Sequence, residues 1–287
     1  MSSVLAPPAA ELARLDAAFA ARLVPVAGAG AVSVRECGAG TALVCLHGIG
    51  SGSASWFECA LALAGDARVL AWDAPGYGAS TPLLPPRPAA ADYAARLLEL
   101  LDALAIEDCV LVGHSLGALV AAAAARRGSG SPWAGRIRRL ALISPAIGYG
   151  APGREAECQR VRAERLDTLQ RLGIAGMAAQ RAGRLLSEHA DERAHQWVRW
   201  NMGRLHEQGY RQAVELLCGG NLLADLPPAM PAHVACGALD VVTTPESCTL
   251  VAERCGVPLE RLPDAGHACY VEQPERVAAW LRRVLAS

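Results

Sequence analysis

A serine between two glycines is the first place in this sequence where residue types and spacing point to chemistry. Ser115 is the centre of Gly113-His114-Ser115-Leu116-Gly117, which has the spacing G-x-S-x-G. The aliphatic residues 110–112 predict a buried strand before it, and the alanine-rich residues 118–127 predict a helix after it. A strand, a sharp turn and a helix in this order expose a strained serine hydroxyl, and the glycines let strand and helix approach closely. Ser115 is therefore a predicted nucleophile.

A serine nucleophile also needs a base and an acid that orients the base. Asp240 ends an apolar run that predicts a strand, and His267 lies in a glycine-containing loop after the next predicted strand. The carboxyl ends of parallel strands meet at one edge of a sheet, and open α/β sheets bind their ligands at that edge. We therefore expect His267 as the base and Asp240 as the acid, both at the edge where Ser115 lies.

A glycine-rich stretch, residues 47–53, follows the apolar run at residues 41–46. Such a loop can cradle a phosphate, but it lacks the Gly-Lys-Ser/Thr of a P-loop and the spacing of a dinucleotide-binding loop. We prefer a loop that directs a backbone N–H at a developing negative charge, and a plain turn is the alternative. His47 lies inside this loop, so we interpret it as a residue that orders the loop and not as the base.

The elements that must position these residues alternate between strand and helix. Besides the strands already named, apolar runs predict strands at residues 32–37, 69–72 and 137–143, with helical patterns between them. This alternation predicts an α/β fold with a mostly parallel, doubly wound sheet that carries helices on both faces.

Two segments depart from that alternation. Residues 150–222 have helical patterns without a strand signal, which predicts a helical cap inserted into a core of residues 1–149 and 223–287. Residues 9–23 have apolar side chains at helical spacing, so residues 1–24 are expected to form a helical appendage at the N-terminus; its inward face would hold Leu12, Leu15, Phe19 and Leu23.

Trp197, Trp200 and Met202 lie close together in the last predicted helix of the cap. These side chains would either line an apolar substrate pocket or pack the cap on the core, and the second interpretation is slightly preferred. Substrate choice depends on the cap and the pocket below it. The spacing of the arginines and lysines does not assign any of them to a substrate carboxylate.

Composition limits the classes of partner. The 287 residues are 52% hydrophobic and 19% charged with a net charge of -1, which is typical of a globular protein with a large core and gives no electrostatic case for nucleic acid or an anionic membrane. No apolar run reaches the roughly 18 residues of a membrane span, and the first residues lack the pattern of a secretory signal. The ten cysteines are scattered without metal-ligand spacing. We expect structural thiols, no metal, no cofactor and a reducing, cytoplasmic compartment, while a homo-oligomer stays open.

These motifs together resemble the α/β-hydrolase-fold family from about residue 24 to the C-terminus. The matching stretches are residues 47–50, 73–78, 113–117, 237–240 and 266–267, with 272–274 after them. The resemblance implies that the backbone N–H groups of Ile49 and Leu116 form an oxyanion hole. The branch it is most similar to contains esterases, enol-lactonases, C–C hydrolases of ring-cleavage products and perhydrolases. A serine at position 115 argues against the dehalogenases and epoxide hydrolases of this fold, whose nucleophile is an aspartate.

The function expected from this resemblance is that of a serine hydrolase. It would cleave a carboxylic ester, a lactone or an activated C–C bond of a small-molecule acyl substrate through an acyl-enzyme at Ser115. Two alternatives stay open. One is a lyase or cofactor-free oxygenase that uses His267 as its base, and the other is a non-catalytic binding protein of the same fold, which would not need the intact Ser-Asp-His set.

Overall fold

The computed structural model describes residues 6–28, 30–128, 133 and 135–287. Its centre is an eight-stranded sheet with the strand order β1-β2-β4-β3-β5-β6-β7-β8. β2 pairs antiparallel with both β1 and β4, and all the other neighbouring strands are parallel. The predicted mostly parallel α/β sheet is thus confirmed. The strands are β1 (Ala21–Pro25), β2 (Ala31–Cys37), β3 (Ala42–Leu46), β4 (Arg68–Trp72), β5 (Cys109–His114), β6 (Ile137–Ile143), β7 (Ala232–Gly237) and β8 (Leu259–Leu262).

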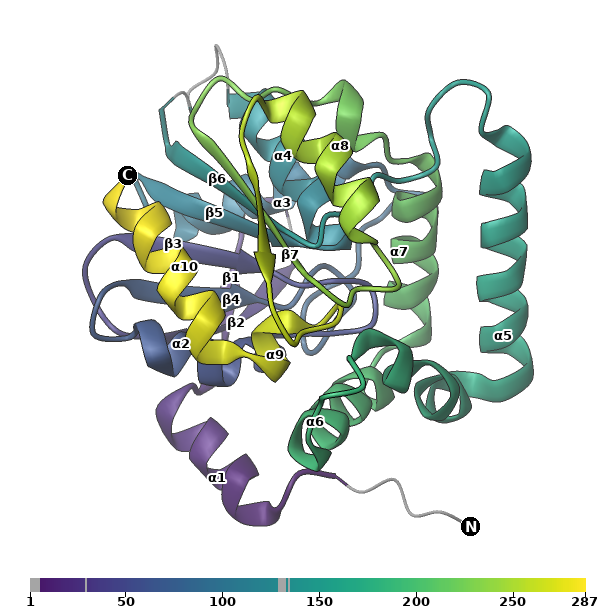
Figure 1. Cartoon of the computed structure of the whole chain (residues 1–287), viewed down its shortest axis with the longest axis horizontal. Helices are drawn as coiled ribbons and strands as arrows, with labels where there is room; N and C mark the ends of the chain where they lie inside the picture. The colour runs from purple at the N-terminus through teal and green to yellow at the C-terminus, as the bar shows by residue number, and fades with distance from the viewer. Residues whose placement is uncertain (1–5, 29, 129–132, 134) are drawn as a thin grey trace.

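Helices cover both faces of the sheet, and the strand side chains divide between them (Figure 1). Val44 and Leu46 of β3 belong to one hydrophobic cluster, whereas Leu43 and Cys45 belong to the other. Successive side chains of a strand point to opposite faces, so a strand covered on both sides is apolar at every position. The first cluster includes α3 (Ala90–Ala103), α4 (Leu116–Gly128) and α8 (Pro245–Cys255), and the second includes α1 (Ala9–Ala18), α2 (Phe57–Leu63), α9 (Cys269–Glu272) and α10 (Pro274–Ala286).

A group of helices lies between β6 and β7 in the chain. These are α5 (Glu155–Arg181), the short η2 (Ala182–Leu185), α6 (Glu192–Gly203) and α7 (Glu207–Gly219), which we call the inserted helices. Figure 1 shows them on the side of the molecule away from the C-terminus. No strand occurs between β6 and β7, all of whose connecting residues are described. The division into core and cap at residues 150 and 222 stays a prediction.

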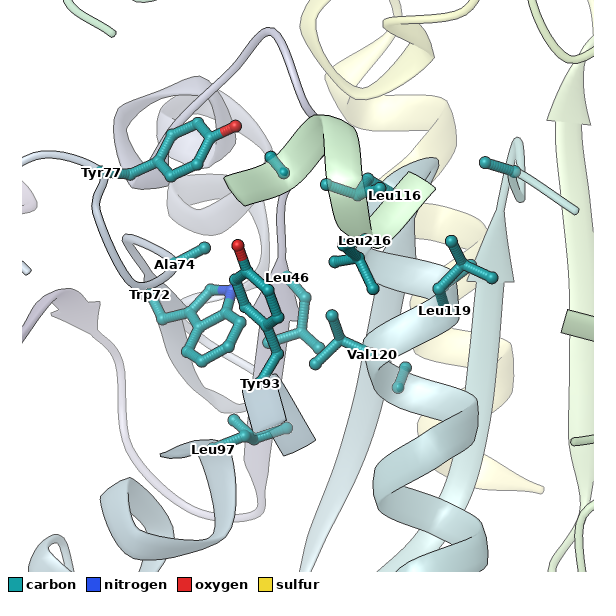
Figure 2. Packing of buried hydrophobic residues seen from close by; sticks show 14 of the residues in the cluster. Leu46, Trp72, Ala74, Tyr77, Tyr93, Leu97, Leu116, Leu119, Val120 and Leu216 are labelled. Atoms are coloured by element: carbon teal, nitrogen blue, oxygen red, sulfur yellow. The ribbon is translucent and has the colours of Figure 1, made fainter. Parts of the chain in front are cut away.

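α7 connects the inserted helices to the core. Figure 2 shows Leu216 of α7 near Leu116, Leu119 and Val120 of α4, and all four side chains are buried in one cluster. α4 therefore has the sheet on one side and α7 on another. The helix that follows Ser115 is held in place by both parts of the chain.

The N-terminal segment differs from the expected helix over residues 9–23. α1 ends at Ala18, and residues 21–25 form β1, which pairs with residues 31–35 of β2. Leu15 and Phe19 are buried as expected, but Leu23 lies in β1 and is 53% exposed. The pairing with β2 satisfies the backbone of this segment, and the local apolar spacing gives no sign of that partner. Residues 1–5 of the expected appendage lie outside the described residues.

Candidate active site

Ser115 occupies the turn between β5 and α4. Its φ is 51°, in the left-handed region that a residue with a side chain adopts at a cost of about 1–3 kcal/mol. The turn is anchored to the segment around β6, because the Ser115 N–H donates to the Ile143 carbonyl at 3.0 Å and the Ala146 N–H donates to the Ser115 carbonyl at 3.1 Å. The strained conformation is thus maintained by hydrogen bonds of both the N–H and the carbonyl of Ser115.

The flanking glycines are required for close packing. A Cβ atom on Gly117 would lie 2.5 Å from the Leu46 carbonyl oxygen, and one on Gly113 would lie 2.7 Å from the Cα of Ala118. Both distances are far below van der Waals contact, and both involve backbone atoms that cannot rotate away. The G-x-S-x-G spacing therefore reflects the close approach of β3, β5 and α4 at this turn.

His267 and Asp240 form a buried pair behind this turn. The Nδ1–H of His267 donates to Oδ2 of Asp240 at 2.8 Å, and the two side chains are 4% and 0% exposed. Since the carboxylate accepts from Nδ1, the Nε2 of the neutral imidazole carries the free lone pair. The structure therefore leaves Nε2 as the atom of His267 that can accept a proton.

The Asp240 carboxylate has a full set of donors. Its Oδ1 accepts from the N–H groups of Val242 and Thr243 at 2.7 and 3.0 Å, and the Thr243 hydroxyl lies 2.9 Å from Oδ2. Burial alone would raise the pKa of Asp240, but the charge and hydrogen bond of His267, together with these donors, outweigh burial and lower that pKa to about 2. Asp240 is therefore ionised at neutral pH.

The loop at residues 47–53 is ordered by His47, the role expected from its sequence position. Its Nδ1–H donates to the Gly48 carbonyl at 2.8 Å, and its Nε2 accepts from the Ala74 N–H at 3.0 Å. Burial lowers the pKa of His47, which favours the neutral form that these two bonds require. The C=O and N–H of one trans peptide point in opposite directions, so fixing the Gly48 carbonyl also fixes the direction of the Ile49 N–H.

One cavity of about 240 Å³ brings the predicted site residues together. Ser115, His267, Ile49, Leu116 and Met202 all line it, and Asp240 lies behind His267 outside the wall. Leu116 is the first residue of α4, where a backbone N–H has no acceptor within the helix. The wall of the cavity also includes residues from the inserted helices, so the cavity lies where these helices meet the ends of the strands.

The two tryptophans of the predicted pocket lie elsewhere. The indole N–H of Trp197 donates to Glu11 of α1 at 2.8 Å, and the ring packs against Phe57 with centroids 5.8 Å apart. Trp200 packs edge-on against Trp197 and carries the Arg204 guanidinium 4.3 Å above its ring. These contacts match the packing interpretation. Met202, in contrast, lies against Gly50 of the loop at residues 47–53, where an added Cβ would meet the Met202 methyl at 2.7 Å.

Two groups of cavity residues were not anticipated from the sequence. Thr243 bridges Asp240 and the Ser144 carbonyl, and no sequence motif marks it. Arg165 and Arg181 of α5 also line the cavity. Their neighbours four residues away are apolar (Val161, Leu169, Met177 and Leu185). This spacing is a sequence signal for an inward face that holds both arginines.

The structure has no group of three or more histidine, cysteine, aspartate or glutamate side chains arranged to hold a metal ion, within the residues it describes. None of its helices, over the same residues, is long and apolar enough to cross a membrane.

Comparison with known proteins identifies the family and supports the fold. The family model described as "Alpha/beta hydrolase family" matches residues 43–280. The pimeloyl-(acyl-carrier protein) methyl ester esterase of Aeromonas hydrophila is 30% identical over 265 residues, which are 85% of this chain and 95% of that protein. Two solved structures share the fold with TM-scores of 0.80: an esterase from Thermogutta terrifontis (23% identity, 93% of this chain, 98% of that chain) and an enol-lactonase from Burkholderia xenovorans (24%, 93% and 100%). The chain belongs to the alpha/beta hydrolase family and is a hydrolase of that fold.

Proposed function

We propose that this protein is a serine hydrolase that cleaves a small-molecule carboxylic ester or lactone through an acyl-enzyme at Ser115. One observation carries the proposal. Strained Ser115 and an imidazole whose Nδ1–H is committed to Asp240 line the same cavity. This arrangement supports a nucleophile, a base with a free Nε2 lone pair, and an acid that sets the tautomer of the base.

In the proposed reaction, Nε2 of His267 takes the proton of the Ser115 hydroxyl while Oγ attacks the substrate carbonyl. The Asp240 carboxylate stabilises the imidazolium that forms. The N–H groups of Ile49 and Leu116 donate to the oxyanion, and one such donor is typically worth about 3 kcal/mol. His267 then protonates the leaving group. A water molecule activated by His267 hydrolyses the acyl-enzyme and returns the proton to Ser115.

An ester is the favoured substrate bond because the Aeromonas hydrophila relative, which is 30% identical over 85% of this chain, is named as a methyl ester esterase. An activated C–C bond remains within the proposal, since the same acyl-enzyme forms after that bond breaks. The proposed location is a reducing, cytoplasmic compartment, which the ten free cysteines support.

Replacing the nucleophile tests the proposal. Purified wild-type protein is expected to hydrolyse p-nitrophenyl butyrate with an acyl-enzyme burst, and a fluorophosphonate is expected to label Ser115 alone. The Ser115→Ala variant should remain folded and lose both the labelling and at least 10³-fold of the turnover. Undiminished turnover by that variant would contradict the proposal, and a wild type that neither hydrolyses the ester nor is labelled at Ser115 would favour the lyase or oxygenase alternative.

A further inference from the structure

The wall of the cavity that the inserted helices contribute is positively charged. Arg165 and Arg181 of α5 and Arg184 of η2 line the same cavity as Ser115. No aspartate or glutamate is among the described residues that line it. Such a charged wall is notable in a chain with a net charge of -1.

The other arginines of α5 show that this charge is not general to the helix. Three of them form ion pairs with carboxylates at 2.8, 3.0 and 2.7 Å: Arg160 with Glu164, Arg162 with Glu215, and Arg171 with Asp167. Arg165 and Arg181, over the described part of the chain, pair with no carboxylate. The arginines that face the cavity are thus the ones without a counter-charge.

The hydrogen bonding of these two guanidinium groups is incomplete. Nη1 of Arg165 donates to the Tyr210 hydroxyl at 3.3 Å, a neutral acceptor at the long end of the range. Nη1 of Arg181 is buried and has no hydrogen-bond partner among the described residues. A buried charged donor that lacks an acceptor is costly, so this wall has unused capacity to bind an anion.

The electrostatic surroundings of Arg181 also favour binding of an anion. Burial lowers the pKa of Arg181, and the positive charge of nearby Arg165 lowers it further. A guanidinium still stays protonated at neutral pH. An anion between the two groups would offset the burial of Arg181 and the repulsion from Arg165, and the planar guanidinium matches a carboxylate through two parallel hydrogen bonds.

We propose that Arg165 and Arg181 form an anion subsite, so that the substrate is an ester or lactone that also carries a free carboxylate. This inference rests on the proposed function, because it places that carboxylate relative to a scissile carbonyl at Ser115. A carboxylate suits this wall because its two oxygens accept the parallel hydrogen bonds that a guanidinium donates. The cavity of about 240 Å³ is below the usual range of about 300–1,000 Å³ for ligand pockets, which favours a compact substrate.

Matched pairs of esters test the subsite. Mono-p-nitrophenyl glutarate and p-nitrophenyl valerate differ by a carboxylate in place of a methyl group on the acyl side. 4-Acetoxybutanoate and butyl acetate differ in the same way on the alcohol side. In at least one pair, kcat/KM of the wild type should be at least 10-fold higher for the charged ester. A charge-assisted hydrogen bond is worth about 1.5–3 kcal/mol, which corresponds to roughly 10- to 150-fold. The ratio of charged to neutral ester should fall by that amount in Arg181→Gln and Arg165→Gln.

A control on the same helix separates the subsite from general charge. Arg160→Gln removes an equal charge from an exposed arginine that pairs with Glu164, and it should leave the ratio within about 2-fold of wild type. Glutarate should also raise the Tm of the wild type and not that of the Arg165→Gln/Arg181→Gln double variant, a readout that needs no turnover.

Failure of the subsite differs from failure of the proposed function. Equal kcat/KM for charged and neutral esters in both pairs, or an equal loss of preference in Arg160→Gln, would overturn the subsite while Ser115-dependent hydrolysis persists. A wild type that hydrolyses none of the four esters and is not labelled at Ser115 would overturn the proposed function, and the subsite with it.

Discussion

The Nε2–H of His114 donates to the backbone carbonyl of His267 at 2.9 Å. The ring centroids of the two histidines lie 4.8 Å apart, and His114 is the residue directly before Ser115. This bond connects the turn that carries the proposed nucleophile to the loop that carries the proposed base. The variable position before the serine of the G-x-S-x-G motif therefore helps to set the distance between these two groups.

His114→Ala should weaken that connection. The His267 carbonyl would lose its donor, and the loop would be free to move the imidazole away from Ser115. We expect kcat/KM for p-nitrophenyl butyrate and the rate of fluorophosphonate labelling to fall together by about 10-fold. His114→Gln, whose amide can donate to the same carbonyl, should recover most of both rates. Equal defects in the two variants would argue against a positioning role.

The same histidine should make the fold sensitive to acid. Burial, and then the charge of His267, lower the pKa of His114 to about 3, below the ordinary value of 6.5. Between pH 6.5 and 3 the unfolded chain therefore binds a proton at this position that the folded chain does not. The stabilisation is complete above pH 6.5 and is lost as the pH falls toward 3, by about 1.4 kcal/mol per pH unit in that window.

Urea unfolding at several pH values between 7 and 4.5 measures this slope. His114→Gln should flatten it by close to one proton, while His189→Gln, a substitution at an exposed histidine, should leave it unchanged. The range stops at pH 4.5 because Asp240, with its pKa lowered to about 2, adds its own loss of stability below pH 4. Parallel slopes for wild type and His114→Gln would contradict the prediction.

Asp240→Asn should abolish most of the activity without unfolding the protein. An amide in place of the carboxylate would donate to Nδ1, so the imidazole would carry its proton on Nε2 and could no longer accept one from Ser115. We expect kcat to fall by about 10³–10⁴-fold with a small change in KM. The matched control is Asp264→Asn, since Asp264 is an exposed carboxylate in the His267 loop, with Arg276 3.9 Å away. A similar loss in both variants would mean that Asp240 has no special role.

Gly117→Ala should destabilise the protein because its Cβ has no space. The added atom would lie 2.5 Å from the Leu46 carbonyl oxygen, so β3 and α4 would have to separate. Overpacking of this kind typically costs about 1–3 kcal/mol of unfolding free energy. Gly203→Ala, with no heavy atom within 4 Å of the new Cβ, should leave stability unchanged or raise it by up to about 1 kcal/mol. Chemical denaturation of both variants decides between these outcomes.

Local sequence was sufficient for the features that depend on a few consecutive residues. Gly113 and Gly117 around Ser115 are needed by the backbone itself, since a Cβ at either position would meet backbone atoms of a neighbouring strand or helix. Apolar runs at residues 42–46 and 109–112 indicate strands that are covered on both faces. Because parallel strands end at one edge of a sheet, the positions of Asp240 and His267 after their strands could also be inferred.

Features that depend on a distant partner could not be inferred in this way. Residues 21–25 form a strand only because β2 lies beside them. Trp197 is a large aromatic residue of the kind that lines apolar pockets. Its indole N–H, however, donates a hydrogen bond to Glu11, 186 positions away in the sequence.

The sequence by itself therefore determined the mostly parallel sheet apart from β1, the Ser115 turn and the order of the residues around it, because backbone geometry and side-chain periodicity act over short distances. Only the tertiary structure decided which side chains of the inserted helices face the cavity. Arg165 has apolar neighbours four residues away, which indicates an inward face, but only the fold places that face against the cavity that holds Ser115, whereas Arg160 pairs with Glu164 at the surface. Which side of a helix is buried depends on the element that packs against it. For the inserted helices that element is the set of loops at the ends of the strands, whose residues are far away in the chain.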